Sequence, residues 1–523
     1  MKRFGVMLDM SRNGVMKVSE LKKYISIVKS FGYNTLLLYM EDTFEVANEE
    51  RFGYLRGKYT IEELKDIVSF CDSNGIEVIP CVQTLAHLNQ IFKWPEYKRI
   101  NDCNDILLVD SPRTYQLIEN IVLTLKDIFK SKYIHIGMDE AHMLGRGKFH
   151  DMHGDENKLD IISRHLSKVA EIVKKHGLKA LMWSDMFFRS VNNGDYYPDE
   201  PVATAEMKNK VNKDAGLVYW DYYHNDAEYY DKMLIAHKEL FDDVWFAGGA
   251  WTWVGFAPGN KKALENMFPA MESARKNNVK NIFITLWGDD GKECSFYSVL
   301  PALYAIKKHY DGETNLNKIK NGFEQIVGEP FDALFSLDNL NYVSGNDSCL
   351  DNKCKYLLYS DVFNGFCNVS NNDVGKEYSL LAKKYLKLSH NSKNYAYLYN
   401  SHMALCKVLE IKSNLGTKTR TAYLNGNITM LNSLIKDYDK LLKRIDAFYV
   451  AFRTLWFKEN KPQGFDVQDI RIGALKQRVR SCRERLKQYV NKEIDDIPEL
   501  CDSLLDFDGA CLFWRDLVTV NLL

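Results

Sequence analysis

The sequence predicts an α/β fold, a (β/α)8 barrel followed by an all-α C-terminal domain. Over roughly the first 310 residues, short β-branched or aromatic runs alternate with amphipathic stretches, which indicates a parallel sheet. Eight strand signals occur in this part, and that number favours a closed barrel, with an open doubly wound sheet as the alternative. After about residue 325 the strand signals nearly vanish and helical patterns take over.

The predicted strands of the barrel are each followed by a turn or a helical stretch. The strands are Phe4–Leu8, Thr35–Tyr39, Glu77–Pro80, Tyr133–Gly137, Lys179–Trp183, Leu217–Trp220, Val244–Gly248 and Ile282–Leu286. The predicted helices between them are Val18–Phe31, Ile61–Ser73, Pro112–Lys130, Leu159–His176, Ala227–Leu240 and Lys261–Asn277.

The C-terminal part is expected to be a separate helical domain. We place the barrel domain at residues 1–325 and the helical domain at 326–523. Segment 315–373, rich in Asn, Asp and Gly, is expected to be a connector with little regular structure. The predicted helices are Glu377–Ser389, Tyr395–Ile411, Ile428–Phe457, Ala474–Val490 and Pro498–Phe507. A basic run within 471–487 is interpreted as a solvated helix face.

Composition narrows the class of protein. The chain has 69 Lys and Arg against 70 Asp and Glu, so it lacks the basic footprint of a nucleic-acid-binding protein. No apolar run reaches about 18 residues, which predicts no membrane span. The N-terminal run Phe4–Leu8 is too short for a secretory signal. Eleven scattered cysteines favour a reducing compartment, and we expect a cytoplasmic protein.

The ends of the predicted strands collect acidic and aromatic residues. Barrel enzymes place their active sites at the carboxyl ends of the strands. Glu41-Asp42, Asp139-Glu140 and Ser184-Asp185 follow strands two, four and five, and six of nine tryptophans lie at or near the ends of strands five to eight: Trp183, Trp220, Trp245, Trp251, Trp253 and Trp287. Sugar rings stack on aromatic side chains, and glycoside hydrolysis uses carboxyl groups. This pattern therefore favours a carbohydrate-active enzyme over a plain aromatic core.

The pair Asp139-Glu140 is the sharpest local feature. Adjacent carboxyls repel each other, so we expect the pKa of one to rise, which would suit a general acid. The run Asp139-Glu140-Ala141-His142 also spells a helicase-type box, but no phosphate-binding loop accompanies it. No HExxH motif is present, and we expect neither a metal ion nor an organic cofactor.

At this point the sequence resembles glycoside hydrolase family 20, the β-N-acetylhexosaminidases. His135-Ile136-Gly137-Met138-Asp139-Glu140 is similar to the family's H-x-G-x-D-E signature. Met7–Arg12, the segment from Ile79 to His87, and Leu286–Asp289 resemble its first-, third- and eighth-strand segments. The resemblance covers about residues 3–308 and implies the barrel fold. The helical second domain resembles that of a bacterial branch without the N-terminal accessory domain.

The resemblance implies substrate-assisted catalysis, in which the substrate's 2-acetamido oxygen attacks the anomeric carbon to give an oxazolinium-type intermediate. It makes Glu140 the general acid and base, and Asp139 the residue that orients the acetamido nitrogen. Asp42 and His87 would form a supporting polar pair. The aromatic walls and the acetamido and hydroxyl contacts would come from Trp183, Trp220, Tyr222, Trp251, Trp253, Trp287 and Asp289.

The sequence departs from the family pattern at the sugar-binding arginine of the first strand. Phe4 stands in that place and Arg3 is one residue away, where a one-residue slip points a side chain to the other face. Arg12, with Asp9 or Glu41, is the expected replacement. Asp289 stands where family members usually have Glu, which leaves the choice between GlcNAc and GalNAc open.

The sequence thus predicts an exo-β-N-acetylhexosaminidase that acts on small oligosaccharides or glycoconjugates. Two alternatives stay open: a retaining glycosidase with an enzyme carboxylate as nucleophile, and a catalytically dead carbohydrate-binding protein. The segment from Trp456 to Arg471 suggests a further hypothesis, because it is a polar loop inside a helical region. This loop would help to form a homodimer or reach a neighbouring active site.

Overall fold

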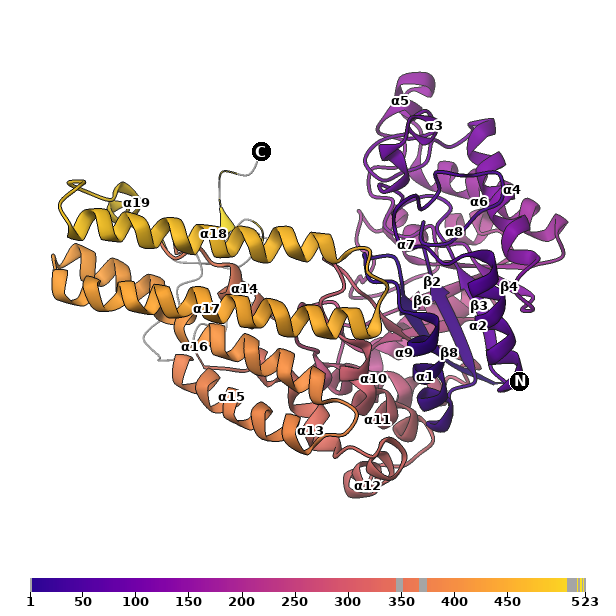
Figure 1. Cartoon of the computed structure of the whole chain (residues 1–523). Helices are drawn as coiled ribbons and strands as arrows, with labels where there is room; N and C mark the ends of the chain where they lie inside the picture. The colour runs from indigo at the N-terminus through magenta and orange to yellow at the C-terminus, as the bar shows by residue number, and fades with distance from the viewer. Residues whose placement is uncertain are drawn as a thin grey trace. The chain divides into compact units, whose positions relative to one another are not determined.

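The computed structural model describes residues 2–344, 351–365 and 374–505, together with 515, 518, 519 and 521 (Figure 1). The chain divides into two compact units. The first comprises Met1–Trp251, Lys261–Gly288 and Leu300–Gly328, and the second comprises Thr252–Asn260, Asp289–Val299 and Glu329–Leu523. Two short segments that follow barrel strands are therefore counted with the second unit. The boundary predicted at residue 325 stays a proposal.

The first unit is a closed barrel of eight parallel strands in sequence order, which confirms the predicted fold. β8 closes the ring on β1, with Phe4 opposite Ile282 and Leu8 opposite Leu286. Nearly every strand residue is buried, as expected of parallel strands covered on both faces. The strands are β1 (Arg3–Asp9), β2 (Thr35–Tyr39), β3 (Glu77–Cys81), β4 (Tyr133–His135), β5 (Lys179–Trp183), β6 (Ala215–Trp220), β7 (Trp245–Gly249) and β8 (Asn281–Leu286).

Helices follow the strands, as the amphipathic pattern predicts. The larger ones are α1 (Val18–Ser30), α2 (Ile61–Ser73), α4 (Pro112–Lys126), α6 (Lys158–Lys175), α9 (Ala227–Leu240), α10 (Asn260–Lys276) and α11 (Leu300–Tyr310). α2 begins with a capping box between Thr60 and Glu63, which satisfies two terminal N–H groups. Short helices within the loops were not predicted: η1 (Ile91–Lys93), α3 (Pro95–Lys98), α5 (Lys148–His153), α7 (Asp185–Val191), α8 (Ala205–Lys210) and η2 (Phe296–Val299).

The second unit contains long helices that pack in sequence order, α15 on α16, α16 on α17 and α17 on α18 (Figure 1). They are α15 (Val374–Asn391), α16 (Ala396–Leu424), α17 (Ile428–Glu459) and α18 (Phe465–Val490), followed by the short α19 (Pro498–Cys501). α16 and α18 are longer than predicted: α16 runs 13 residues past Ile411, to Leu424, and α18 starts nine residues before Ala474, at Phe465. Residues 506–507 of the last predicted helix lie outside the described residues.

The prediction of a connector with little regular structure over 315–373 is wrong for most of its described part. That part contains α12 (Leu316–Val327), α13 (Phe331–Phe335), η3 (Ser336–Asn341) and α14 (Lys353–Tyr359). The side chain of Asn315 accepts hydrogen bonds from the N–H groups of Asn317 and Lys318 and so caps α12. Gly328 ends that helix in the left-handed conformation. Residues interpreted as loop formers are therefore helix caps.

The basic run on α18 is also different from the prediction of a solvated face. Arg478 binds the buried carboxylate of Asp361, with 2.5 Å between Nε and Oδ2. Lys476 pairs with Asp446, and Arg483 pairs with Asp439. These cations join α18 to its neighbours within the second unit, because acidic residues elsewhere in the helical region face them.

Among the described residues, no helix is long and apolar enough to cross a membrane.

Candidate active site

The polar side chains of the candidate site gather at the carboxyl ends of the first five strands, all within the first unit. Asp9 is the last residue of β1, and Glu41 follows β2. Gln83 and His87 follow β3, whereas Asp139 and Glu140 come after β4. Asp185 is two residues beyond the end of β5. Because parallel strands of a barrel end on the same rim, these side chains share one mouth.

A sharp bend after β4 places the two predicted catalytic carboxyls. Gly137, Met138 and Glu140 have φ angles of 71°, 71° and 51°. A non-glycine residue in this left-handed region is uncommon and marks strain that the surroundings must hold. A Cβ on Gly137 would lie 2.0 Å from Gln83 Oε1, so the bend requires glycine. The bend also explains why β4 ends at His135 and not at Gly137.

The bend brings both carboxyls to one imidazole. His87 Nε2 lies 3.3 Å from Asp139 Oδ2 and 3.7 Å from Glu140 Oε2. Gln83 fixes the bend from below, since its Nε2 donates to Asp139 Oδ1 at 2.7 Å and its Oε1 accepts the N–H of Met138 at 3.1 Å. The side chain of Asp139 is 12% exposed and that of Glu140 is 40% exposed. Glu140 is therefore the member of the pair that is open to solvent.

The electrostatics of the pair favour an ionised Asp139. Burial would raise the pKa of Asp139, but His87 and the Gln83 amide together hold that pKa below its ordinary value. Burial would lower the pKa of His87, but Asp139 raises it to about 10. Asp139 and His87 thus form an ion pair at neutral pH. The prediction was that one carboxyl of the pair Asp139-Glu140 has a raised pKa, whereas the pKa of Asp139 is lowered and a raised carboxyl pKa is that of Asp185, outside the pair.

Asp185 was not among the predicted site residues. Its buried Oδ2 accepts the N–H of Glu140 at 3.0 Å and Nε of Arg189 at 3.3 Å. Burial, and then the negative charge of Asp139, raise the pKa of Asp185 to about 7. Its place just after β5 was the available signal. Gln83 and Tyr39, whose hydroxyl donates to Glu41 at 3.0 Å, were also missed, because only the folded structure shows whom they contact.

The predicted residues Asp9, Arg12 and Glu41 come together on the first two strands. Arg12 Nη2 lies 3.1 Å from Glu41 Oε1, and Arg12 Nε lies 3.9 Å from Asp9 Oδ2. Asp9 Oδ2 also accepts the N–H of Gly288 at 2.9 Å. Burial raises the pKa of Glu41 to about 7, although Arg12 opposes this shift. The cluster thus sets a guanidinium among carboxyls at the barrel mouth.

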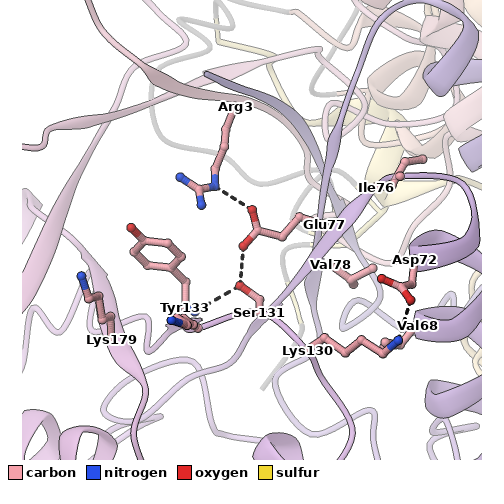
Figure 2. Close-up of a pocket in the computed structure, with 12 residues that line it drawn as sticks. Arg3, Val68, Asp72, Ile76, Glu77, Val78, Lys130, Ser131, Tyr133 and Lys179 are labelled. Carbon is pink, nitrogen blue, oxygen red and sulfur yellow. Dashed lines mark hydrogen bonds and ion pairs between the residues drawn. The ribbon is translucent and has the colours of Figure 1, made fainter. Parts of the chain in front are cut away.

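Arg3 lies at the other end of the barrel, because it is the first residue of β1. Figure 2 shows Arg3 beside Glu77 and Ser131: Arg3 Nε is 2.7 Å from Glu77 Oε2, and the other oxygen of Glu77 accepts from Ser131 Oγ. These residues line a cavity of about 520 Å³. The Arg3 guanidinium also lies over the rings of Tyr133 and Trp245, at 4.8 and 5.5 Å. Arg3 and Trp245 therefore belong to the amino end of the strands, and Trp245 is not a mouth residue.

Asp42 has a different partner from the one that the resemblance implied. Its carboxylate binds Arg56, with 3.3 Å between Nε and Oδ2, and no pair with His87 forms. Arg56 also donates to the carbonyl oxygen of Ser11 at 2.5 Å and to Asn13 Oδ1 at 2.7 Å. Asp42 thus helps to shape the loop after β1 instead of supporting the acid.

Aromatic residues form a connected wall over the ends of β5 to β8. The rings of Trp183 and Trp287 are 6.0 Å apart, and Trp220 stacks on Tyr222 at 5.3 Å. Trp251 Nε1 donates to the carbonyl oxygen of Tyr222 at 3.2 Å. The Tyr222 hydroxyl is hydrogen-bonded to Trp287 and Thr285. Trp183 is buried and therefore belongs to the core of the barrel.

Two predicted sugar-binding residues, Trp253 and Asp289, fall in segments of the second unit. Trp253 is half-buried and Asp289 is exposed. Asp289 begins the segment Asp289–Val299, directly after Gly288.

Comparisons with known proteins agree with this geometry. Residues 3–229 match the family model for the glycosyl hydrolase family 20 catalytic domain. Residues 329–512 match the model for the glycoside hydrolase 20C C-terminal domain. Hexosaminidase D of Homo sapiens is 25% identical over 342 residues, which are 62% of this chain and 67% of that protein. Beta-hexosaminidase of Akkermansia muciniphila is 24% identical over 236 residues, 38% of this chain and 46% of that protein.

Among solved structures, the exo β-N-acetylglucosaminidase of Vibrio harveyi in complex with N-acetylglucosamine is similar with a TM-score of 0.48 and 16% identity. The alignment covers 65% of this chain and 58% of that one. The family assignment rests on the sequence models, since a catalytic-domain model and a C-terminal-domain model of the same family match successive parts of the chain. This chain belongs to glycoside hydrolase family 20, the family of the β-N-acetylhexosaminidases.

Proposed function

We propose that this glycoside hydrolase is an exo-β-N-acetylhexosaminidase. It removes terminal β-linked GlcNAc, with GalNAc as the alternative, from small oligosaccharides or glycoconjugates. The observation that carries the proposal is the pair Asp139-Glu140 around His87, in which Asp139 is held as an anion and Glu140 is open to solvent. The hexosaminidase names of the relatives support the same substrate class.

In the proposed reaction, the substrate's own acetamido oxygen is the nucleophile. It attacks the anomeric carbon while Glu140 donates a proton to the departing glycosidic oxygen. The acetamido nitrogen gains positive charge in the resulting oxazolinium ion. Asp139 accepts the hydrogen bond of that N–H group and balances the charge. Water then attacks the anomeric carbon and gives its proton to Glu140, so that the β configuration is retained and no metal or organic cofactor takes part.

The environment of Asp139 supports this assignment. A charge-balancing group must be ionised at working pH, and the ion pair with His87 together with the Gln83 hydrogen bond keeps Asp139 ionised. A general acid must reach the leaving group, and Glu140 is the exposed partner. The hydrogen bond from the Glu140 N–H to Asp185 fixes the backbone of the acid.

Sugar recognition is proposed for the surrounding residues. Trp220, Tyr222 and Trp251 supply an aromatic wall, and Trp287 joins it through the Tyr222 hydroxyl. The Tyr222 hydroxyl also suits the acetamido oxygen. Arg12, set by Asp9 and Glu41, supplies the cation for sugar hydroxyls that the family places on its first strand. Trp253 and Asp289 are proposed as further sugar contacts.

Proton NMR of a short chitooligosaccharide digest tests the stereochemistry and the exo action together. The proposal expects GlcNAc to be released from the non-reducing end, with the β anomer appearing before mutarotation supplies the α anomer. An α anomer at the earliest time points would contradict the proposed reaction. Release of internal fragments would contradict exo action.

The cellular setting and assembly are also proposals. The eight cysteines among the described residues are all free thiols, which supports a reducing, cytoplasmic compartment. The loop that suggested a dimer is accounted for within the chain, since Trp456 is buried and Arg471 binds Glu293 of the same second unit. A homodimer therefore stays a prediction, which sedimentation equilibrium measures.

A further inference from the structure

A second pocket, of about 420 Å³, lies in the first unit beside the loops that follow β4 and β5. We call it the Lys158 pocket and define it by the lining residues that the argument uses: His142, Arg146, Glu156, Lys158 and Arg189. None of them belongs to the predicted sugar-binding set. The pocket is lined by the cationic side chains of Arg146, Lys158 and Arg189 and by one carboxylate, Glu156, which distinguishes it from the acidic mouth of the barrel.

The Lys158 pocket adjoins the backbone of the proposed general acid. The N–H of His142 donates to the carbonyl oxygen of Glu140 at 2.6 Å. Arg189 Nε lies 3.3 Å from Asp185 Oδ2, the oxygen that accepts the N–H of Glu140. A general acid protonates the leaving-group oxygen, so the departing part of the substrate passes the side of Glu140. The pocket is therefore placed for the aglycone and not for the sugar that is cleaved off.

The pocket holds cationic charge that its carboxylates do not balance. Lys158 Nζ donates to the carbonyl oxygen of His142 at 2.6 Å, and no carboxylate of the described residues lies within 4.0 Å of it. Arg146 is 3.5 Å from Asp155, a side chain that is 82% exposed. Both oxygens of Glu156 are taken by Arg164, at 2.5 and 3.2 Å. Burial, with the charge of Arg146, accordingly lowers the pKa of Lys158.

The start of α6 adds to this positive potential. Lys158 is the first residue of that helix, which is 18 residues long, and Asn157 caps it. A helix N-terminus carries a partial positive charge that favours anions. Guanidinium and ammonium groups bind carboxylate and phosphate oxygens well.

We propose that the Lys158 pocket is an aglycone subsite for an anionic group, a carboxylate or a phosphate, on the part of the substrate that leaves. The proposal rests on the proposed hexosaminidase function and adds its substrate class. The preferred substrate is then a β-N-acetylhexosaminide whose neighbouring unit is acidic. An anion in the pocket would neutralise Lys158 and Arg146 together.

The test uses three aryl β-N-acetylglucosaminides that differ only in a meta substituent of the leaving phenol: a carboxylate, a phosphate or a neutral carboxamide. The measured quantity is the ratio of kcat/KM for each acidic substrate to that for the carboxamide. We expect Lys158→Met to lower this ratio about fivefold, because a partly exposed ion pair contributes about that much. Higher ionic strength should lower the wild-type ratio in the same direction. The larger of the two acidic ratios identifies the preferred anion.

Lys175→Met is the matched control, because Lys175 lies at the other end of the same helix and pairs with Glu119. It should leave the ratio at the wild-type value. Arg146→Gln is a second pocket variant in case Lys158→Met does not fold, and circular dichroism checks both. Ratios that are equal in the wild type and both pocket variants would overturn the subsite and leave the hexosaminidase function intact.

A binding measurement keeps the two hypotheses separate. Calorimetric titration with free 3-hydroxybenzoate and 3-hydroxybenzamide needs no turnover. The subsite predicts that the wild type binds the benzoate more tightly than the benzamide, and that Lys158→Met removes the difference. Equal binding of both probes would overturn the subsite. If none of the three substrates is cleaved, the proposed function is wrong. The titration still tests the subsite in that case, because it needs no turnover.

Discussion

Gln83 holds the geometry of the proposed catalytic pair. It binds the carboxylate of Asp139 with its amide nitrogen and the N–H of Met138 with its amide oxygen. It also donates to the hydroxyl of Tyr39, which in turn binds Glu41. One buried amide after β3 therefore joins the acidic residues that follow β2 and β4. In the proposed reaction Gln83 would act through Asp139, as a positioning residue.

Gly137→Ala should disturb this arrangement directly. The new methyl group would overlap Gln83 Oε1, and the φ of 71° would add strain of about 1–3 kcal/mol. We expect lower stability in urea unfolding and a kcat lowered by about tenfold or more, because Asp139 loses its position. Gly473→Ala is the control, since a Cβ there meets nothing and the residue is helical. A variant with wild-type kcat would show that the bend does not set the catalytic geometry.

The variant Glu140→Gln tests the proposed role of Glu140 independently of that of Asp139. The variant should lose about 100-fold or more of kcat/KM on substrates with poor leaving groups, because protonation of the leaving oxygen is lost. Activated aryl substrates should lose much less. Asp139→Asn is the companion variant and should impair both substrate kinds. Equal losses on both kinds in Glu140→Gln would remove the acid role.

The ion pair of His87 and Asp139 gives stability a defined pH window. The folded pKa of His87 is about 10, above the ordinary 6.5, so its contribution is complete below about pH 6.5 and is lost as the pH rises toward 10. The folded pKa of Asp139 is below 3.8, so its contribution is present above that value and is lost as the pH falls through the folded pKa. His87→Gln should therefore lower Tm most between about pH 4 and 6.5. A Tm difference that does not shrink toward pH 10 would contradict the pairing.

At the residue scale, the sequence predicted candidate site residues that lie directly beside a predicted strand. Asp139 and Glu140 follow a strand directly, and Arg12, Asp9 and Glu41 flank two others. Gln83 and Asp185 were not predicted as functional, because an amide or carboxyl near a strand end is common. Their importance depends on hydrogen bonds to Met138 and Glu140 that join different strands.

At the scale of elements, the loop after β8 is fastened by helices of the second unit. Arg471 of α18 lies 2.9 Å from Glu293, and Lys355 of α14 lies 2.8 Å from the other oxygen of that buried carboxylate. Ser295 Oγ donates to Glu459 of α17 at 2.6 Å. The loop that begins with Asp289 is thus held by three helices.

Arg471→Ala tests whether the loop depends on this contact. Removing Arg471 leaves the buried Glu293 with Lys355 as its remaining cation and also removes a hydrogen bond to the carbonyl oxygen of Asp290. We expect a loss of about 1–3 kcal/mol in the free energy of unfolding, measured in urea, because the buried Glu293 loses a cation. Arg480→Ala is the control, because Arg480 donates to Gln477 of its own helix. Unchanged stability of Arg471→Ala would show that the loop does not depend on Arg471.

Elements were predicted best where hydrophobic periodicity is long. All eight strands and the larger barrel helices except α11 were found, since each buries an apolar face. The short helices between 316 and 359 were missed, because Asn315 and Gly328 serve as helix caps, whereas their residue types suggested a loop. The same polar residue types form both structures, and composition alone does not distinguish them.

At the scale of the whole molecule, the two units are interleaved along the chain. Thr252–Asn260 and Asp289–Val299 belong to the second unit, although barrel segments precede and follow them. α10 also begins at Asn260, where the second unit gives way to the first. Because these segments of the second unit are covalently joined at both ends to the first, unfolding of one unit also disturbs the other.

We expect one cooperative thermal transition for this reason. Differential scanning calorimetry should give a single peak whose van't Hoff enthalpy matches the calorimetric enthalpy. Two well-separated peaks would show that the units unfold independently despite the shared segments. A truncated chain that ends at Gly328 should accordingly fold poorly.

The barrel architecture and the reaction class were predictable from strand order and from the residues at strand ends. The arrangement of the two units along the chain was not, because the loops after β7 and β8 belong to the helical unit through contacts between residues far apart in the sequence, such as Lys355 and Glu293. Patterns that are local in the sequence do not report these partners.

The central claim is that the substrate's acetamido group is the nucleophile. The most direct measurement compares hydrolysis of a chromogenic β-N-acetylglucosaminide with that of the matching β-glucoside, each with and without a thiazoline analogue of the oxazoline. The account predicts cleavage of the acetamido sugar alone and its inhibition by the thiazoline. Cleavage of the glucoside would contradict it, because a sugar without the acetamido group has no internal nucleophile.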